Sequence, residues 1–208
     1  ASLSGVLPAR LLTSLSVLLI GYSLGLVLAG LLTCIGIASS MGRELLTMLT
    51  AMFNPLPAIA LLPLAMLWFG LGTPSLVFVL AHSVIWAVAL NTLTGFESVS
   101  PTLRMVGRNY GLRGPAYVFQ ILIPAALPSL LAGLKVGWAF AWRTLIAAEL
   151  VFGVAAGSGG LGWFIYENKN QLEIPSVFAG LVTVILIGLV VENFVFRMIE
   201  SRTIGRWG

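Results

Sequence analysis

The chain alternates between long apolar segments and short stretches in which polar and charged residues gather. Apolar runs of about 20 residues are long enough to cross a lipid bilayer as helices. The pattern therefore predicts an all-α membrane protein of one domain, residues 1–208, with five transmembrane helices over residues 11–40, 45–71, 75–96, 127–152 and 176–196.

One connection between these segments is both polar and basic. Residues 98–124 separate the third and fourth apolar segments and carry three arginines, Arg104, Arg108 and Arg113. Lys and Arg residues in short loops stay on the cytoplasmic side of a membrane. We therefore expect this loop to be cytoplasmic and to meet a partner there.

The other basic residues fit this orientation. Alternation of the spans places Arg43 and the basic tail 197–206 on the same side as the 98–124 loop. The connection over residues 153–175, which opens with several glycines, is then expected to be a periplasmic loop. No basic segment followed by a cleavage site precedes the first span, so no signal peptide is expected.

Composition narrows the class of protein. The 208 residues are 59% hydrophobic and 9% charged, whereas soluble domains are about 25% charged. The net charge of +4 indicates membrane orientation rather than a nucleic-acid surface, because orientation follows the Lys and Arg of short loops. One cysteine, Cys34, and one histidine, His82, cannot supply four zinc ligands. We expect no metal site and no cofactor in this chain.

The first two spans contain residues with special backbone properties. Gly21, Gly25 and Gly30 recur about every four residues in the first span, and small residues at this spacing let helices approach closely. The second span is interrupted by prolines at positions 55, 57 and 63, which remove backbone donors and disfavour the preceding helical turn. We expect a kinked, discontinuous helix there. It either lines a translocation path, with Asn54 as a candidate path residue, or serves packing alone.

The third span carries polar side chains that are costly to place in lipid. His82 and Trp86 are four residues apart and therefore share a helix face, and Asn91 follows near the end of the span. These three residues are candidates for a translocation path. For His82, a satisfied position inside the bundle is the alternative.

The fourth span contains three ionisable residues, Lys135, Arg143 and Glu149. Lys135 is close enough to the start of the span to extend back to the interface. Arg143 lies deeper, roughly 22 Å along a helix that starts near Ser129, at about 1.5 Å per residue. Arg143 and Glu149 are six residues apart and cannot pair within one helix. Arg143 either pairs with another helix or lines an anion path, and both residues are candidates for such a path.

The spacing around Gly111 resembles the signature of one family. Nine residues separate Gly111 from Ile121-Leu122-Ile123-Pro124, as in the motif E-A-A, three residues, G, nine residues, I-x-L-P. This is the signature of the permease subunits of binding-protein-dependent ATP-binding-cassette importers. The E-A-A triplet is Met105-Val106-Gly107 here, and Ile123 stands where the family has Leu. The likeness to the nitrate, sulfonate and taurine branch extends over residues 62–72, 126–137, 147–149 and 191–208.

The resemblance implies how the chain would work. It implies a permease in a bacterial inner membrane that pairs with a second copy of itself. Two cytoplasmic ATP-binding subunits would drive it, and a periplasmic solute-binding protein would deliver a small anion such as nitrate, taurine or an alkanesulfonate. The chain has no G-x-x-x-x-G-K-[ST] motif, so we expect no enzymatic activity and ATP hydrolysis in the separate subunits.

The resemblance also assigns a role to the basic loop. Family members have six spans, so one earlier span is expected before residue 1. The 98–124 loop would form a coupling helix that inserts into a cleft of the ATPase subunit. Its expected contact residues are Arg104, Arg108, Asn109, Tyr110, Gly111, Leu112, Arg113 and Gly114.

Three other classes of protein compete with this interpretation. A secondary transporter or channel would need internal repeats or ion-relay carboxylates, and the one acid deep inside a predicted span is Glu149. An intramembrane enzyme would need a Ser–His or carboxylate-pair site, and His82 stands alone among the spans. A scaffold subunit would lack a translocation path of its own.

Overall fold

The computed structural model describes residues 3–152 and 159–203, and the elements in these ranges are all helical. The long helices are α1 (Leu3–Ala38), α2 (Ser40–Phe53), α4 (Thr73–Glu97), α7 (Ile123–Phe152) and α9 (Ile174–Val190). The shorter ones are η1 (Ala58–Leu61), α3 (Leu62–Phe69), α5 (Pro101–Asn109), α6 (Gly114–Tyr117), η2 (Val118–Leu122), α8 (Leu161–Asn170), η3 (Val191–Phe196) and α10 (Arg197–Thr203). The predicted all-α fold is confirmed for the described residues.

Four stretches of helix are long and apolar enough to cross a membrane: Gly5–Ala38, Thr73–Glu97, Gly114–Val151 and Ile174–Thr203. They contain most of the first, third, fourth and fifth predicted spans. The fourth begins earlier than the sequence predicts, because α6 continues through the π-helical η2 into α7.

The second predicted span is a broken one. Ser40–Phe53 and Ala58–Phe69 are bent by 87° relative to each other. Pro55 and Pro57 lie in the turn between the two halves, where no helical donor is needed. Pro63 lies in the first turn of α3, a position that tolerates proline because its N–H has no intrahelical partner. The predicted discontinuity is confirmed, and proline chemistry accounts for its place.

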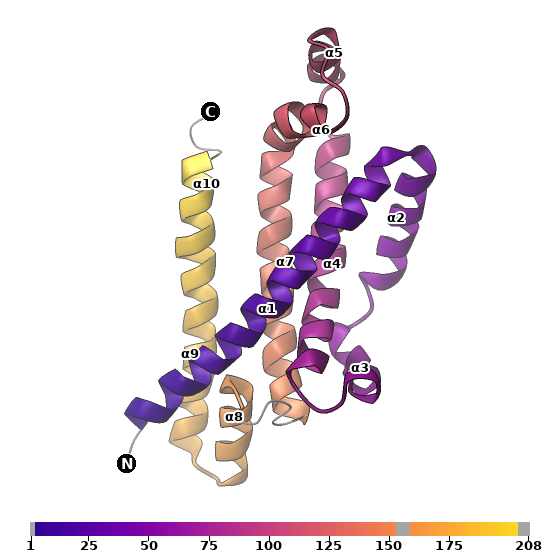
Figure 1. Ribbon diagram of the computed structural model, residues 1–208. Coiled ribbons are helices and arrows are strands. Elements are labelled where there is room, and N and C mark those ends of the chain that lie inside the picture. Colours follow the sequence, from indigo (N-terminus) through magenta and orange to yellow (C-terminus); the bar gives the residue numbers. More distant parts are fainter. Residues whose placement is uncertain (1–2, 153–158, 204–208) are drawn as a thin grey trace.

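The helices form a bundle with two distinct ends (Figure 1). α4 and α7 run along each other, and α1 crosses them diagonally. The start of α2, the short helices α5 and α6, and α10 lie toward one end, whereas α3 and α8 lie toward the other. Alternation of the spans predicts this arrangement of the basic segments.

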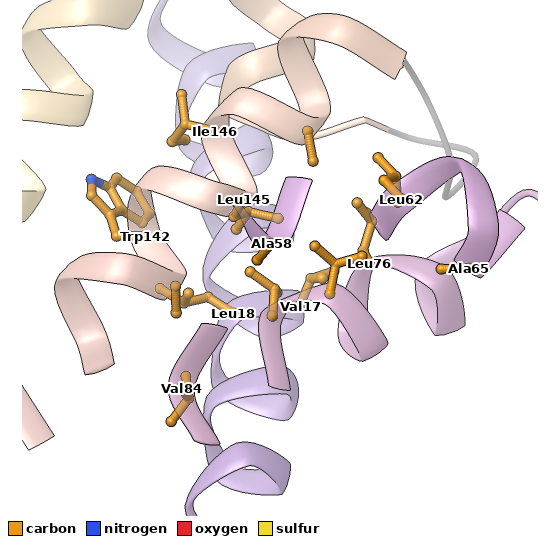
Figure 2. Close-up of a cluster of buried hydrophobic side chains, with 14 of the residues drawn as sticks. Val17, Leu18, Ala58, Leu62, Ala65, Leu76, Val84, Trp142, Leu145 and Ile146 are labelled. Atoms are coloured by element: carbon orange, nitrogen blue, oxygen red, sulfur yellow. The ribbon is translucent and has the colours of Figure 1, made fainter. Parts of the chain in front are cut away.

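The core lies where α1, α4, α7 and the η1–α3 segment meet (Figure 2). Leu18, Val84 and Leu145 are fully buried there and come from three different helices. Ala58 and Leu62 add the second half of the broken span to the same cluster. The core therefore fixes the bend of that span against the two central helices.

The glycines of α1 differ in their surroundings. A Cβ atom on Gly21 would lie 2.6 Å from Leu80 Cβ, and one on Gly25 would lie 2.6 Å from Val84 Cβ. Both glycines therefore let α1 pack directly on α4, as predicted. A Cβ on Gly30 would meet nothing within 4 Å among the described residues, so Gly30, on the exposed side of the helix, makes no such contact within this chain.

This difference supports a test of how α1 packs on α4. We expect Gly25→Leu to destabilise the protein by about 1–3 kcal/mol, the usual cost of forcing extra carbons into a packed interface. Gly30→Leu is the matched control and should leave stability unchanged. Thermal unfolding of the two purified variants in the same detergent gives the comparison, and equal melting temperatures would contradict the close approach at Gly25.

The predicted loop over residues 153–175 contains a helix, so the prediction of a plain loop is wrong for its second half. Residues 153–158 lie outside the described ranges, and α8 occupies Leu161–Asn170. Leu161, Phe164 and Ile165 are buried at helical spacing, so one face of α8 packs against the bundle. The glycines before α8 and the polar residues after it concealed this short amphipathic pattern.

Candidate functional site

A cavity of about 250 Å³ lies at the break in the second span. The turn between α2 and η1 forms one side, and side chains from α4 and α7 form the others. Its lining residues are Phe53, Asn54, Pro55, Leu56, Pro57, Ala58, His82, Ser83, Trp86, Phe140, Arg143 and Thr144. Four of the six predicted path residues, Asn54, His82, Trp86 and Arg143, therefore lie around one cavity.

The α4 side of the cavity is aromatic with polar edges. Phe53 stacks on Trp86 with ring centroids 5.0 Å apart and an interplanar angle of 18°. His82 meets the edges of both rings, at 6.2 Å from Phe53 and 6.0 Å from Trp86. Both ring nitrogens of His82 and Nε1 of Trp86 are buried without a hydrogen-bond partner among the described residues. Such groups are costly to leave unpaired, and a polar occupant of the cavity would reach them only if the surrounding side chains moved.

Arg143 supplies positive charge from α7. Its Nε donates a hydrogen bond to the Ala139 carbonyl at 3.0 Å, and its guanidinium carbon lies 5.1 Å from the centre of the Phe140 ring. Within residues 3–152 and 159–203 it forms no ion pair. Of the two alternatives that the sequence left open, pairing with another helix therefore finds no partner in the described part of this chain.

Two predicted path residues do not line the cavity. Asn91 lies farther along α4, where its side chain donates to the Ala87 carbonyl at 2.8 Å and packs near Gly133. Glu149 is buried in contact with α1 and α8. The grouping of these two residues with the others is therefore not reproduced in the geometry.

Glu149 and Ser14 hold the start of α8. Ser14 Oγ lies 3.0 Å from both carboxylate oxygens of Glu149, and the Gly162 N–H donates to Oε2 at 2.8 Å. The Leu161 N–H donates to Ser14 Oγ at 2.8 Å. The first N–H groups of a helix have no partner inside the helix. Two side chains from other helices therefore satisfy them here, and the negative charge suits this end of the helix dipole.

A salt bridge beside this cluster joins α1 to α8 as well. Arg10 donates to the Gly159 carbonyl at 3.1 Å and lies 3.4 Å from Glu167. A second salt bridge, between Lys135 and Glu192 at 3.1 Å, joins α7 to η3. Lys135 therefore finds an acid on the neighbouring span. The extension of Lys135 to the membrane interface stays a prediction, and both side chains of this pair are about half exposed.

The basic loop folds into two short helices separated by a tight turn. The N–H groups of Gly111 and Leu112 donate to the carbonyls of Arg108 and Gly107, which is the Schellman arrangement that ends many helices. Gly111 has φ 73° and Gly114 φ 54°, in the left-handed region that favours glycine. The sharp turn between α5 and α6 therefore depends on these two residues.

The predicted contact residues of this loop point in different directions. Arg108, Asn109, Tyr110, Gly111, Arg113 and Gly114 are exposed. Arg104 and Leu112 are partly buried. Arg104 donates to the main-chain carbonyls of Phe96 and Val99 at the end of α4. Arg104 is therefore engaged within the chain, and the six exposed residues remain available to a partner.

Several residues of the cavity and its surroundings escaped the sequence analysis. Phe140 lies three residues before Arg143 and four before Thr144, so helical spacing links Phe140 to each of them. Ser14 could not be linked to Glu149, because 135 residues separate them. The buried stripe of Trp142, Leu145 and Glu149 does repeat at helical spacing, and it signals that Glu149 faces the bundle.

Comparison with known proteins agrees with this architecture. Residues 21–205 match the family model described as "Binding-protein-dependent transport system inner membrane component". The chain is 30% identical over 208 residues to the putative aliphatic sulfonates transport permease protein SsuC of Bacillus subtilis, covering 99% of this chain and 72% of the relative. It is 29% identical over 189 residues to the nitrate import permease protein NrtB of Synechocystis, covering 91% and 67%.

A third relative, the taurine transport system permease protein TauC of Escherichia coli, is 30% identical over 161 residues, or 76% of this chain. This chain spans 57% of the length of that relative, and 56% of a putative ABC transporter permease of Methanocaldococcus jannaschii. The family model covers most of the 208 residues, including the basic loop and the cavity. The chain belongs to the family of inner membrane components of binding-protein-dependent transport systems.

Proposed function

We propose that this chain is the membrane-spanning subunit of an ATP-driven importer and forms the translocation path for a small anionic solute. The observation that carries the proposal is the cavity at the broken span. It has Arg143 on one side, and its lining contains no acidic residue. A cation without a counter-ion at membrane depth favours an anion, because each would otherwise remain unpaired in a medium of low polarity.

The remaining lining residues fit a small anion. The Thr144 hydroxyl offers a hydrogen-bond donor beside Arg143, and the N–H groups of Trp86 and His82 lie in the α4 wall, where the Ser83 hydroxyl already donates to the Leu80 carbonyl. Hydrogen bonds from such groups to a charged acceptor are stronger than those between neutral groups. Nitrate, taurine and aliphatic sulfonates are the solutes in the names of the relatives, and each carries an anionic oxygen group. The proposal extends this class to the present chain.

The broken span gives the cavity its shape. Backbone without helical hydrogen bonds is tolerated at membrane depth only where it is covered by protein or lines a water-filled space. The turn over residues 54–57 is exposed and lines the cavity beside α4 and α7, which fits the second of these conditions. Discontinuous helices of this kind occur at the solute sites of other transporters. The break therefore serves the path in this proposal, rather than packing alone.

The partners of this chain in the proposal follow from the separate functions of the subunits of such an importer. A second copy of the chain would complete the path, two cytoplasmic ATP-binding subunits would supply the work, and a solute-binding protein would deliver the anion. The exposed apolar side chains of α9, among them Phe178, Ile185 and Leu189, suit lipid or a second copy. This chain would bind no ATP itself.

Reconstitution tests this proposal. The full-length permease, its ATP-binding subunits and its solute-binding protein are placed in liposomes, with nitrate, taurine and ethanesulfonate as probes. We expect uptake that requires ATP and the binding protein and that persists when the proton gradient is collapsed. Uptake that follows the proton gradient without ATP would instead support a secondary transporter.

The exposed arginines of the basic loop allow a test of the ATPase contact. We expect Arg108→Glu combined with Arg113→Glu to prevent co-purification of the ATP-binding subunits, because two exposed cations become anions at the docking surface. Arg202→Glu is the matched control, since Arg202 is exposed in α10 toward the same end of the bundle. Unchanged recovery of the ATP-binding subunits with the double variant would argue against docking at this loop.

A further inference from the structure

We infer that Arg104 is a positioning residue that fastens α5 to the end of α4, so that movement of α5 reaches the cavity through α4. The inference rests on the proposed function, in which α5 is the part of the chain that meets the ATP-binding subunit. Nothing in the family signature requires an arginine at this position, which lies immediately before the triplet Met105-Val106-Gly107.

The contacts of Arg104 join two elements. Its Nε donates to the Val99 carbonyl at 3.1 Å, and an Nη donates to the Phe96 carbonyl. The carbonyls at the end of a helix have no partner inside it and carry partial negative charge, so a cation stabilises them. The planar guanidinium can bind both oxygens at once with little loss of freedom. The first turn of α5 is thereby held on the last turn of α4.

The two bound residues are themselves firmly anchored. The side chains of Phe96 and Val99 are each 6% exposed and pack with Leu122 and Ala126. Phe96 lies in the last turn of α4 and Val99 in the short connection to α5, and Arg104 therefore bonds to carbonyls of residues whose side chains are packed in one buried cluster. A displacement of α5 is transferred to this cluster without an intervening flexible segment.

α5 is also fixed on its other side. Gly107 is buried, and a Cβ atom placed on it would lie 2.8 Å from Ile121 Cγ1 and 3.0 Å from a Tyr117 ring carbon. This contact leads through η2 into α7. A movement of α5 can therefore be transmitted toward the cavity in two ways, through α4 and through α7.

The two routes differ in stiffness. α4 is helical from Thr73 to Glu97, and its one proline lies at the start. Trp86 is ten residues before Phe96, which is about 15 Å of helix at 1.5 Å per residue. The α7 route passes through the π-helical η2 and past Pro128 inside the helix, both of which are points where helices bend. The α4 route is therefore the stiffer one, and Arg104 is its first link.

Chemical labelling of the cavity tests this inference in the assembled complex. Ser83 lines the cavity from α4, so Ser83→Cys in a Cys34→Ser background reports on access to it. The alkylation rate of this cysteine by a small maleimide is measured in nanodiscs with and without ATP and vanadate. We expect ATP to change the rate severalfold with Arg104 present, and to leave it unchanged with Arg104→Gln in a complex that still assembles.

Two further variants separate positioning from folding. Arg104→Lys keeps the charge but cannot bind two carbonyls through one planar group, so it should retain part of the ATP response. Arg202→Gln, an exposed arginine toward the same end, should retain all of it. An ATP response in Arg104→Gln equal to that of the parent would overturn the inference alone. A parent without any ATP response would overturn the proposed function and the inference with it.

Discussion

Replacing Arg143 by glutamine should reduce anion uptake at low solute concentration by about 10- to 100-fold. A hydrogen bond to a charged group contributes about 1.5–3 kcal/mol, and each 1.4 kcal/mol changes an equilibrium about tenfold. The effect is expected to be large because Arg143 is the one permanently charged side chain among the lining residues, and no acid there neutralises it. In a pair of subunits the change would occur twice.

The measurement compares uptake and anion-stimulated ATP hydrolysis over a range of anion concentrations in reconstituted complexes. Arg143→Lys should be less impaired than Arg143→Gln, because it keeps the charge. Arg197→Gln, an exposed arginine in α10, serves as the control for loss of charge away from the cavity. If Arg143→Gln leaves both uptake and anion-stimulated hydrolysis unchanged, the assignment of the cavity to the path is wrong.

The second large effect concerns Glu149, and it acts on stability instead of transport. Glu149→Ala removes the acceptor of the Ser14 hydroxyl and of the Gly162 N–H. Each buried donor left without an acceptor costs about 1–3 kcal/mol. We therefore expect a strongly lowered melting temperature and increased hydrogen exchange of α8.

The control is another acid near α8. Glu173→Ala should have little effect, because Glu173 is exposed and its side chain makes no cap hydrogen bond. Glu149→Gln should be intermediate, since an amide keeps one acceptor oxygen but adds a donor facing other donors. Normal exchange of α8 amides in Glu149→Ala would contradict the capping role.

Gly162 gives an independent view of the same cluster. A Cβ atom at this position would lie 2.6 Å from Glu149 Cβ and 2.6 Å from the Ile146 carbonyl oxygen. The close approach of α8 to α7 therefore requires glycine here. The sequence analysis treated this glycine-rich stretch as part of a loop. Its last glycines instead allow a helix to dock, and residues 153–158 lie outside the described ranges.

The two ionisable residues of α7 illustrate what a pattern can and cannot decide. From sequence, Arg143 and Glu149 were equivalent candidates for a path, since both are costly in lipid. Their burial and partners separate them. Arg143 lies at the cavity, and Glu149 is 4% exposed and bound to α1 and α8. The cost of burying charge predicts that each of the two residues has either an interaction partner or a role in transport. It does not say which of these applies to which residue.

Arg104 provides a similar case at the basic loop. Three arginines within ten residues predict a cytoplasmic surface. This prediction depends only on their charge and does not distinguish one arginine from another. Arg108 and Arg113 are exposed, whereas Arg104 turns toward the end of α4. The direction of an arginine depends on which backbone carbonyls lie within reach. That depends on how α5 packs, which no local pattern contains.

Local sequence patterns are enough to predict the class of fold, the approximate positions of the long apolar helices, the break at the prolines and the place of the basic segments. These follow from local physics: apolar length for crossing lipid, proline geometry, and the preference of Lys and Arg for one side of the membrane. Tertiary structure alone decided which polar side chains share a cavity and which hold helices together. Asn54, Trp86 and Arg143 come together from three helical segments only because α4, α7 and the broken span pack side by side. Contacts between residues so far apart in the chain depend on crossing angles and close glycine approaches, such as that of α1 to α4 at Gly25.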